Sequence, residues 1–160
     1  MTPPLRRASA VTAAAALLVA LAGCGEDDDP YAVPDRFEGY CEEVAEQQAA
    51  IGRALESGGE ATGLIRALPS FEALAEKAPD DIADDWEVVI ERIDGLVGAL
   101  EDAGVDPASY DRRKPPTGLD PEQRDAIDAA AVALVSTTTA QAMSSVQQQA
   151  RDVCKTPLLS

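Results

Sequence analysis

The chain has 160 residues, a formal net charge of −16 and no histidine. The excess of acidic side chains argues against a nucleic-acid-binding protein, because phosphates are bound through Lys and Arg. Without histidine the chain has no Ser-His or Cys-His catalytic pair and no imidazole ligand for a metal. The length suits one domain.

The first residues have the pattern of an export signal. Arg6 and Arg7 precede an apolar run from Ala8 to Ala22, and the small residue Gly23 follows. Positive, apolar and small residues in this order are typical of a secretory signal peptide. The run is shorter than the roughly 20 apolar residues that a membrane-spanning helix needs. The paired arginines leave twin-arginine export open beside ordinary secretion.

The residues Leu21-Ala22-Gly23-Cys24 resemble the lipobox of bacterial lipoproteins. In that family the cysteine thiol is acylated and the leader is cleaved directly before it, so that the new N-terminal cysteine holds the protein to a membrane. The resemblance implies that residues 1–23 are removed and that Cys24 carries the lipid. It also implies that the rest of the chain is extracytoplasmic and anchored to the bacterial cell membrane.

Residues 24–34 are predicted to form an acidic tether. Four consecutive acids, from Glu26 to Asp29, are followed by Pro30 and Pro34. At about 3.3 Å per residue, this segment could reach roughly 30 Å from the membrane. Loss of the two leader arginines would make the net charge still more negative, which disfavours lying flat on anionic lipid.

Residues 35–157 are predicted to form one all-α domain, an up-and-down antiparallel bundle of about four helices. The first helix is expected from Asp35 to the Gly58-Gly59 pair, because paired glycines break helices. The second is expected to end before Pro79. It contains Pro69, which leaves open whether it is one kinked helix or two short ones. Apolar residues recur every three or four positions in both helices: Phe37, Tyr40, Cys41, Val44, Ile51, Leu55, Leu64, Ile65, Leu68, Phe71 and Leu74.

The third helix is expected from Pro79 to Gly104, and it has the clearest amphipathic stripe of the chain. Acids crowd its first turns, where the positive end of the helix dipole stabilises them. Its apolar stripe comprises Ile82, Trp86, Val89, Ile90, Ile93, Leu96, Val97 and Leu100.

The fourth helix is expected from Asp120 to Val153, after a non-helical stretch over 105–119 in which Asp106-Pro107 starts one short turn. The sequence Asp120-Pro121-Glu122-Gln123 combines an N-cap residue, a proline at the first position and a glutamine at the third, which is a strong helix start. Its inner face is expected to hold Ile127, Ala131, Leu134, Thr138, Ala142, Val146, Gln149 and Val153.

The three cysteines are expected to have two roles: one carries the lipid and two form a disulfide. With Cys24 assigned to the lipid, Cys41 and Cys154 form an even pair in an oxidising compartment, where disulfides persist. Cys41 lies near the start of the first helix and Cys154 at the end of the fourth. Because these ends meet in an up-and-down four-helix bundle, we predict a Cys41–Cys154 disulfide.

Clusters of acids and hydroxyls are the only candidates for metal binding or catalysis. Acids near the start of the third helix could offer oxygens to calcium, but they lack EF-hand spacing. Glu43 and Glu46 have the spacing of some iron sites but no histidine partner. The hydroxyls of residues 136–139 lack a nucleophile motif and are expected to bond to helix carbonyls. We therefore predict no catalytic residue, no metal and no cofactor. The acids considered as calcium ligands, near the start of the third helix, are Asp80, Asp81, Asp84, Asp85 and Glu87.

A basic run, Arg112-Arg113-Lys114, stands out in the acidic chain. Together with Tyr110 it is a possible partner contact at the tip farthest from the membrane, because loops on rigid scaffolds often carry function. An acidic protein, a glycan acid or a lipid phosphate would suit these cations, and a solvated loop without function is the alternative.

The expected function is a non-catalytic binding or scaffolding module of the cell envelope. The partner is an unknown envelope protein or ligand, and nucleic acid is not expected. The alternative is a carboxylate-based metal-binding protein or enzyme. The mature part also resembles small helical extracytoplasmic lipoproteins of high-GC bacteria, on its acidic helical sequence, an Ala-Pro-Asp-Asp-Ile helix start and a cysteine near the C-terminus. That resemblance implies no catalytic residue.

Overall fold

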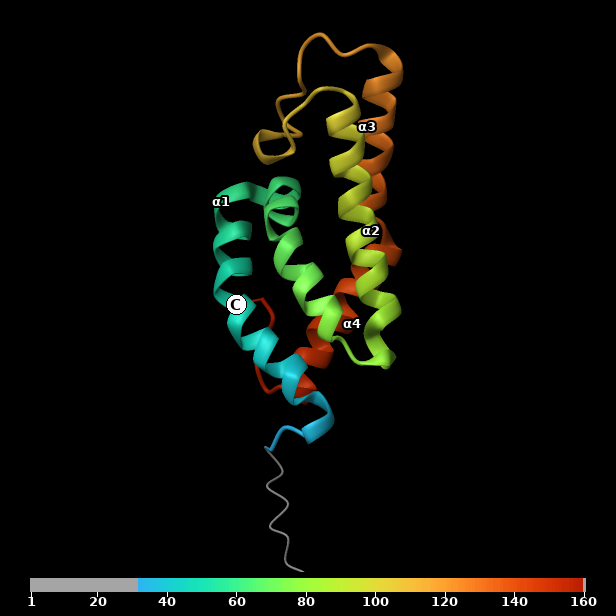
Figure 1. Cartoon of the computed structure of the whole chain (residues 1–160). Helices are drawn as coiled ribbons and strands as arrows, with labels where there is room; N and C mark the ends of the chain where they lie inside the picture. Colours follow the sequence, from blue (N-terminus) through green and yellow to red (C-terminus); the bar gives the residue numbers. More distant parts are fainter. Residues whose placement is uncertain (1–31, 160) are drawn as a thin grey trace, which may run out of the picture. The chain divides into compact units, whose positions relative to one another are not determined.

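A computed structural model describes residues 32–159, apart from the side chains of residues 59 and 60. The predicted leader, the lipobox with Cys24 and nearly all of the tether lie outside the described residues. Within them every regular element is helical, which confirms the all-α class for this part of the chain. The elements are η1 (Asp35–Phe37), α1 (Glu38–Lys77), α2 (Asp80–Asp102), η2 (Pro107–Ser109), α3 (Pro121–Leu134) and α4 (Thr137–Val153), where η denotes a 3₁₀ turn (Figure 1).

Helix α1 is continuous over 40 residues, yet it turns back on itself near its middle (Figure 1). In a straight helix, positions eight residues apart are separated by about 12 Å. Here a Cβ added to Gly63 would lie 2.9 Å from the Cα of Leu55, and one added to Gly58 would overlap the backbone of Gly63. The expected break at Gly58-Gly59 is therefore a reversal within one helix. Glycine is needed there because the two arms touch through their backbones.

Pro69 lies at an exposed position in the second arm of α1, and the helix continues through it. Proline removes one backbone donor and crowds the carbonyl four residues earlier. The helix nevertheless extends for two more turns, so the second predicted helix is not divided into two at this residue.

Helix α2 ends where the sequence predicts. Gly104 has a φ of +71°, a conformation that favours glycine. Its N–H donates to the carbonyl of Glu101 at 2.9 Å, and the N–H of Val105 donates to that of Leu100 at 2.8 Å. This pair of hydrogen bonds is the Schellman motif, which satisfies carbonyls at a helix C-terminus.

Two predicted N-terminal signals are also confirmed. The Asp120 carboxylate accepts from the N–H of Gln123 at 2.9 Å, and the Gln123 side chain accepts from the N–H of Asp120 at 3.1 Å. This capping box opens α3. Asp106 caps η2 by accepting from the N–H of Ala108 at 3.0 Å.

The expected fourth helix is wrong as a single element, because Val135 and Ser136 separate α3 from α4. Serine favours the N-cap position, and the Ser136 hydroxyl accepts from the N–H of Thr139 at 3.3 Å. The Thr139 hydroxyl in turn donates to the carbonyl of Ala133 at 2.8 Å, as expected for hydroxyls in this stretch. Thr139 is buried and the expected Thr138 is exposed, whereas Ala142 and Val146 are buried as expected.

Helix α2 is the central element, and it packs against α1, α3 and α4. The rings of Phe71 in α1 and Trp86 in α2 are fully buried with their centroids 5.7 Å apart. No helix of residues 32–159 is long and apolar enough to cross a bilayer. Besides these two rings, the large buried side chains include Tyr40, Val44, Ile51, Leu74, Ile93, Leu96, Leu100, Ile127, Leu134, Val146 and Leu158.

The folded domain extends beyond the expected boundary at residue 157. Leu158 is 1% exposed and belongs to the core, although it follows the last helix. The amide of Gln48 in α1 donates to the carbonyl of Pro157, which holds the C-terminal segment against the first arm of α1.

Candidate binding site

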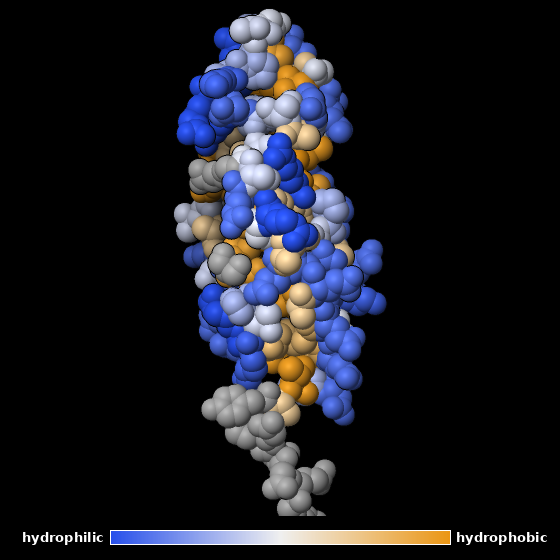
Figure 2. All heavy atoms as spheres, turned by 90° about the vertical axis from the view of Figure 1, so that its left-hand side faces the viewer, coloured by the Kyte–Doolittle hydropathy of each residue, from blue (hydrophilic) through white to orange (hydrophobic). Residues whose placement is uncertain are grey.

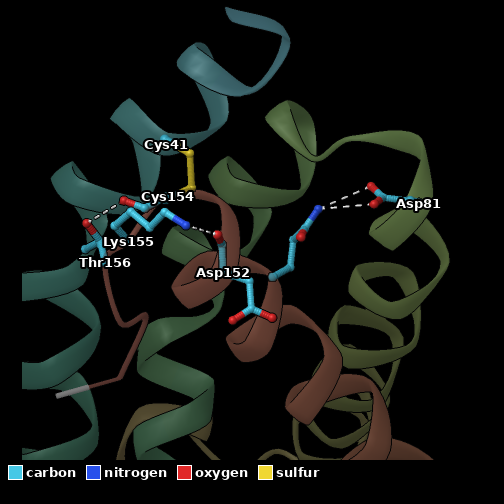
Figure 3. The surroundings of a disulfide bond; sticks show 7 residues. Cys41, Asp81, Asp152, Cys154, Lys155 and Thr156 are labelled. Carbon is cyan, nitrogen blue, oxygen red and sulfur yellow. Dashed lines mark hydrogen bonds between the residues drawn. A yellow bond between two sulfur atoms is a disulfide. The ribbon is translucent and has the colours of Figure 1, made fainter. Parts of the chain in front are cut away.

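The two ends of the domain differ, and one is closed by a disulfide (Figure 3). Cys41 in α1 is bonded to Cys154 directly after α4, with their Cα atoms 5.0 Å apart and a sequence separation of 113. The Lys155 ammonium donates to the carbonyl of Asp152 at 2.7 Å, and the Thr156 hydroxyl donates to that of Cys154 at 3.2 Å. This is the pairing predicted from the sequence.

Polar side chains at the disulfide end are hydrogen-bonded to one another. The Asp81 carboxylate of α2 accepts from the amide of Gln149 in α4 at 3.2 Å (Figure 3). The Arg36 guanidinium lies 4.5 Å from the centre of the buried Phe37 ring. Asp81 and Gln149 also line a small, mainly polar pocket of about 270 Å³ between α2 and α4.

Away from the disulfide, the domain contains a cleft of about 900 Å³. Three segments meet there: the reversal of α1, the loop 108–113 and the junction between α3 and α4. Figure 2 looks onto the side of the first arm of α1. In the upper half of this view, apolar surface is exposed between strongly hydrophilic side chains. The cleft therefore brings together parts of the chain that are far apart in sequence.

The floor of the cleft is apolar. Ala131 and Leu134 of α3 are buried, and Leu64 of α1 and Met143 of α4 are half-buried. Val135 is 51% exposed, because the break between α3 and α4 removes it from the helical face that packs on the core. Flexible methionine side chains are common on surfaces that adapt to apolar ligands.

The serine and threonine hydroxyls that line the cleft each already donate to a backbone carbonyl of the protein. These hydroxyls belong to Ser57, Thr62, Ser109 and Thr139. The buried Thr62 hydroxyl donates to the carbonyl of Tyr110, which ties the loop to α1. The floor therefore offers few free polar groups to a ligand.

Cationic side chains surround the cleft. Arg66 donates to the Ser57 hydroxyl at 3.2 Å and to the carbonyl of Ala108 at 2.8 Å, so both partners of its guanidinium are neutral. Arg112 is exposed. Arg113 is 91% exposed, and its Nε lies 3.7 Å from a carboxylate oxygen of Asp111. Three guanidinium groups and one carboxylate thus line the cleft of a strongly acidic chain.

The four residues predicted as a partner contact have different environments. The side chain of Tyr110 is only 5% exposed, and it lines the cleft together with its neighbours in the loop. Burial raises the pKa of its hydroxyl, and the nearby Arg112 opposes that rise. Arg112 and Arg113 line the cleft, whereas Lys114 is exposed outside it.

Sequence reasoning missed Arg66, Val135 and Met143 as lining residues. The serine of the Ser136-Thr137-Thr138-Thr139 stretch is an N-cap signal that would have marked the helix break and the exposure of Val135. Nothing in the local sequence distinguishes Arg66 from other solvated arginines, because its position depends on the reversal of α1.

The acidic residues considered as metal ligands are engaged elsewhere or lie apart. Asp81 accepts from Gln149, and Glu43 accepts from the amide of Gln47 at 2.8 Å. Within residues 32–159 no three His, Cys, Asp or Glu side chains are grouped closely enough to hold a metal ion.

Comparison with known proteins adds no relative: no protein-family model, no curated protein and no solved structure matches the chain. The chemistry of binding therefore has to be derived from the cleft itself.

Proposed function

We propose that the chain is a lipid-anchored extracytoplasmic module of the cell envelope that binds an anionic ligand or partner in the cleft. The anchor is Cys24 of the lipobox-like sequence. A tether that ends at residue 34 would join the domain at the disulfide end, where η1 lies (Figure 1). The cleft would then lie in the part of the domain that is remote from the membrane.

In this proposal the two arms of α1, helix α2, and α3 with α4 act as an up-and-down antiparallel bundle. The reversal of α1 and the disulfide between its start and the end of α4 support this arrangement. A bundle of this kind provides a rigid scaffold, so that the loop 108–113 can be held in one position over the cleft.

The observation that carries the proposal is the composition of the cleft. An apolar floor is surrounded by more positive than negative side chains, although the whole chain has a net charge of −16. Concave apolar sites with a few convergent polar groups are typical of ligand binding. Opposite charge also speeds encounter with an anionic partner. A carboxylate-based metal site or enzyme has less support, because candidate acids such as Asp81 and Glu43 accept hydrogen bonds from glutamine amides.

Substitution of the predicted lipidation site tests the anchor. The Cys24→Ala variant should lose incorporation of labelled fatty acid and accumulate as uncleaved or released protein. The Cys41→Ala variant is the matched control, and it should keep the label because that cysteine is not acylated. Normal membrane retention of Cys24→Ala would refute the lipoprotein assignment.

Site-specific crosslinking in living cells tests the cleft. A photoreactive amino acid at position 135, inside the cleft, should give adducts that the same residue at position 132 does not. Val132 is the matched control because it is 58% exposed and lies outside the cleft. The combined Arg112→Glu and Arg113→Glu substitutions should reduce the adducts at position 135, while Lys114→Glu should not. Equal labelling at positions 132 and 135 would overturn the proposed site.

A further inference from the structure

We propose that the ligand of this cleft is an amphiphilic acid: an apolar body lies on the floor, and one carboxylate or phosphate group is held at the rim by Arg112 and Arg113. This inference rests on the proposed function and names the ligand class of the same site. The acid group defines the shared chemistry, whether it comes from a free fatty acid or from an anionic phospholipid.

The floor favours an apolar body over a sugar or a peptide. The volume of the cleft, about 900 Å³, lies within the range of small-molecule sites, about 300–1,000 Å³. Sugar hydroxyls and peptide amides lose water on burial and need hydrogen-bond partners. The hydroxyls of Thr62 and Thr139 already donate to backbone carbonyls, whereas Leu64, Leu134 and Met143 offer only apolar contact.

The rim favours an acid head group. Arg112 lies close enough to the Tyr110 hydroxyl to oppose the rise of its pKa, so this guanidinium is positioned on the loop that covers the cleft. Arg113 is highly exposed and only 3.7 Å from Asp111, a weak pairing that a better-aligned acid can replace. Planar guanidinium groups bind carboxylates and phosphates through paired, charge-assisted hydrogen bonds.

Arg66 strengthens the same preference. Its guanidinium donates to the neutral oxygens of Ser57 and Ala108, so no carboxylate compensates its charge among these partners. It also fixes the loop over the cleft, because Ala108 precedes the two rim arginines. Its charge is therefore available to an anion without a rearrangement of the loop.

Photo-crosslinking of the full chain in phosphatidylcholine vesicles tests the inference. One probe is a diazirine fatty acid with a free carboxylate, and a second has the same chain with a trimethylammonium head. A phosphatidylglycerol with the diazirine in its acyl chain tests the phospholipid source. We expect the anionic probes to label the segments around residues 64, 135 and 143, mapped by mass spectrometry. The cationic probe should label them at least about tenfold less, because charge-assisted hydrogen bonds to an acid are lost.

Matched variants separate the cleft from its surroundings. Arg112→Ala combined with Arg113→Ala should reduce labelling by the fatty acid about tenfold, whereas Lys114→Ala in the same loop should not. Met143→Gln should reduce labelling by placing a polar group in the floor, whereas Val132→Gln should not. Circular dichroism and the intact disulfide show that each variant is folded.

The outcomes distinguish the ligand class from the proposed site. Equal labelling of the cleft by the anionic and cationic probes, or equal effects of the Lys114 and Arg112/Arg113 variants, would overturn the amphiphilic acid. If adducts at position 135 still form in cells and still depend on the arginines, the proposed binding site stands and only its ligand class is wrong. If those adducts are absent as well, both proposals fail.

Discussion

The disulfide end and the cleft end of the domain are built by different means. At the disulfide end a covalent bond joins Cys41 to Cys154, and Leu158 of the C-terminal segment is buried in the core. At the cleft end the loop over the cavity is held by side-chain hydrogen bonds from Thr62 and Arg66. The first end is joined covalently and has only a small, mainly polar pocket, whereas the second has the larger cleft, which is lined by cations.

The difference indicates a division between stability and binding. Segments with few buried contacts open more readily than the core, and binding surfaces are usually drawn from them. Substitutions at the disulfide end should therefore change mainly the free energy of unfolding. Substitutions at the cleft end should change local opening and ligand binding more than global stability.

The largest expected effect is loss of the disulfide. Replacing Cys41 and Cys154 by alanine should lower the free energy of unfolding by about 4–5 kcal/mol, because the bond closes a very long loop and restricts the unfolded chain. Urea denaturation followed by circular dichroism measures the change. Addition of reductant should destabilise the wild type but not the variant. A loss below about 1 kcal/mol would show that the disulfide end is not the main source of stability.

Truncation of Leu158 should have the next largest effect. Leu158→Ala should lower the free energy of unfolding by about 2–3 kcal/mol, because it removes a buried side chain and leaves a cavity. Leu159→Ala is the matched control, since that neighbour is only half-buried and should cost less. Equal losses in the two variants would contradict the assignment of Leu158 to the core.

Loss of the Thr62 hydroxyl tests the cleft end. Thr62→Val keeps the shape of the side chain but leaves the carbonyl of Tyr110 without its donor, at a cost of about 1–2 kcal/mol. Hydrogen exchange should accelerate in the loop 105–113 more than in α2. Thr138→Val, at an exposed position of α4, should change neither quantity. Unchanged exchange in the loop would mean that other contacts hold it.

The smallest effect is a dependence on alkaline pH. Burial raises the pKa of Tyr40 above 10.0, and the neighbouring Trp86 opposes part of that rise. The unfolded chain therefore ionises first, so the contribution of Tyr40 is complete below pH 10 and is lost as the pH rises towards its folded pKa. The slope is at most about 1.4 kcal/mol per pH unit.

Substitution of each tyrosine shows which end of the domain causes the dependence of stability on alkaline pH. Tyr40→Phe should flatten the decline of stability between pH 9 and 11 more than Tyr110→Phe, because Arg112 opposes the raised pKa of Tyr110. Urea denaturation at several pH values measures both. A larger effect of Tyr110→Phe would reverse this order.

Local signals in the sequence predicted much of the fold. The Asp120 and Gln123 side chains bond within one helical turn, and Gly104 ends α2 through its own backbone conformation. Such features depend on residues close in sequence and can be recognised there. The Cys41–Cys154 pairing followed from the parity of the cysteines and the order of the helices.

Features that depend on distant contacts were not predictable in the same way. Paired glycines permit either a break or a tight reversal, and the approach of Gly63 to Leu55 decides between them. Ser136 could lie within a helix or cap one, and the exposure of Val135 follows from that choice. Three separate segments form the cleft, so the basic run in the sequence predicted only part of its lining.

The disulfide also affects how the protein would respond to proteolysis. Arg112 and Arg113 are exposed in a non-helical loop, where a trypsin-like protease would cut. This loop lies between Cys41 and Cys154, so both fragments of the domain would remain covalently joined after a cut. A nicked molecule would migrate as two fragments on a reducing gel and as one species without reductant. Cleavage at the cleft would thus not release the C-terminal half of the domain from the N-terminal half.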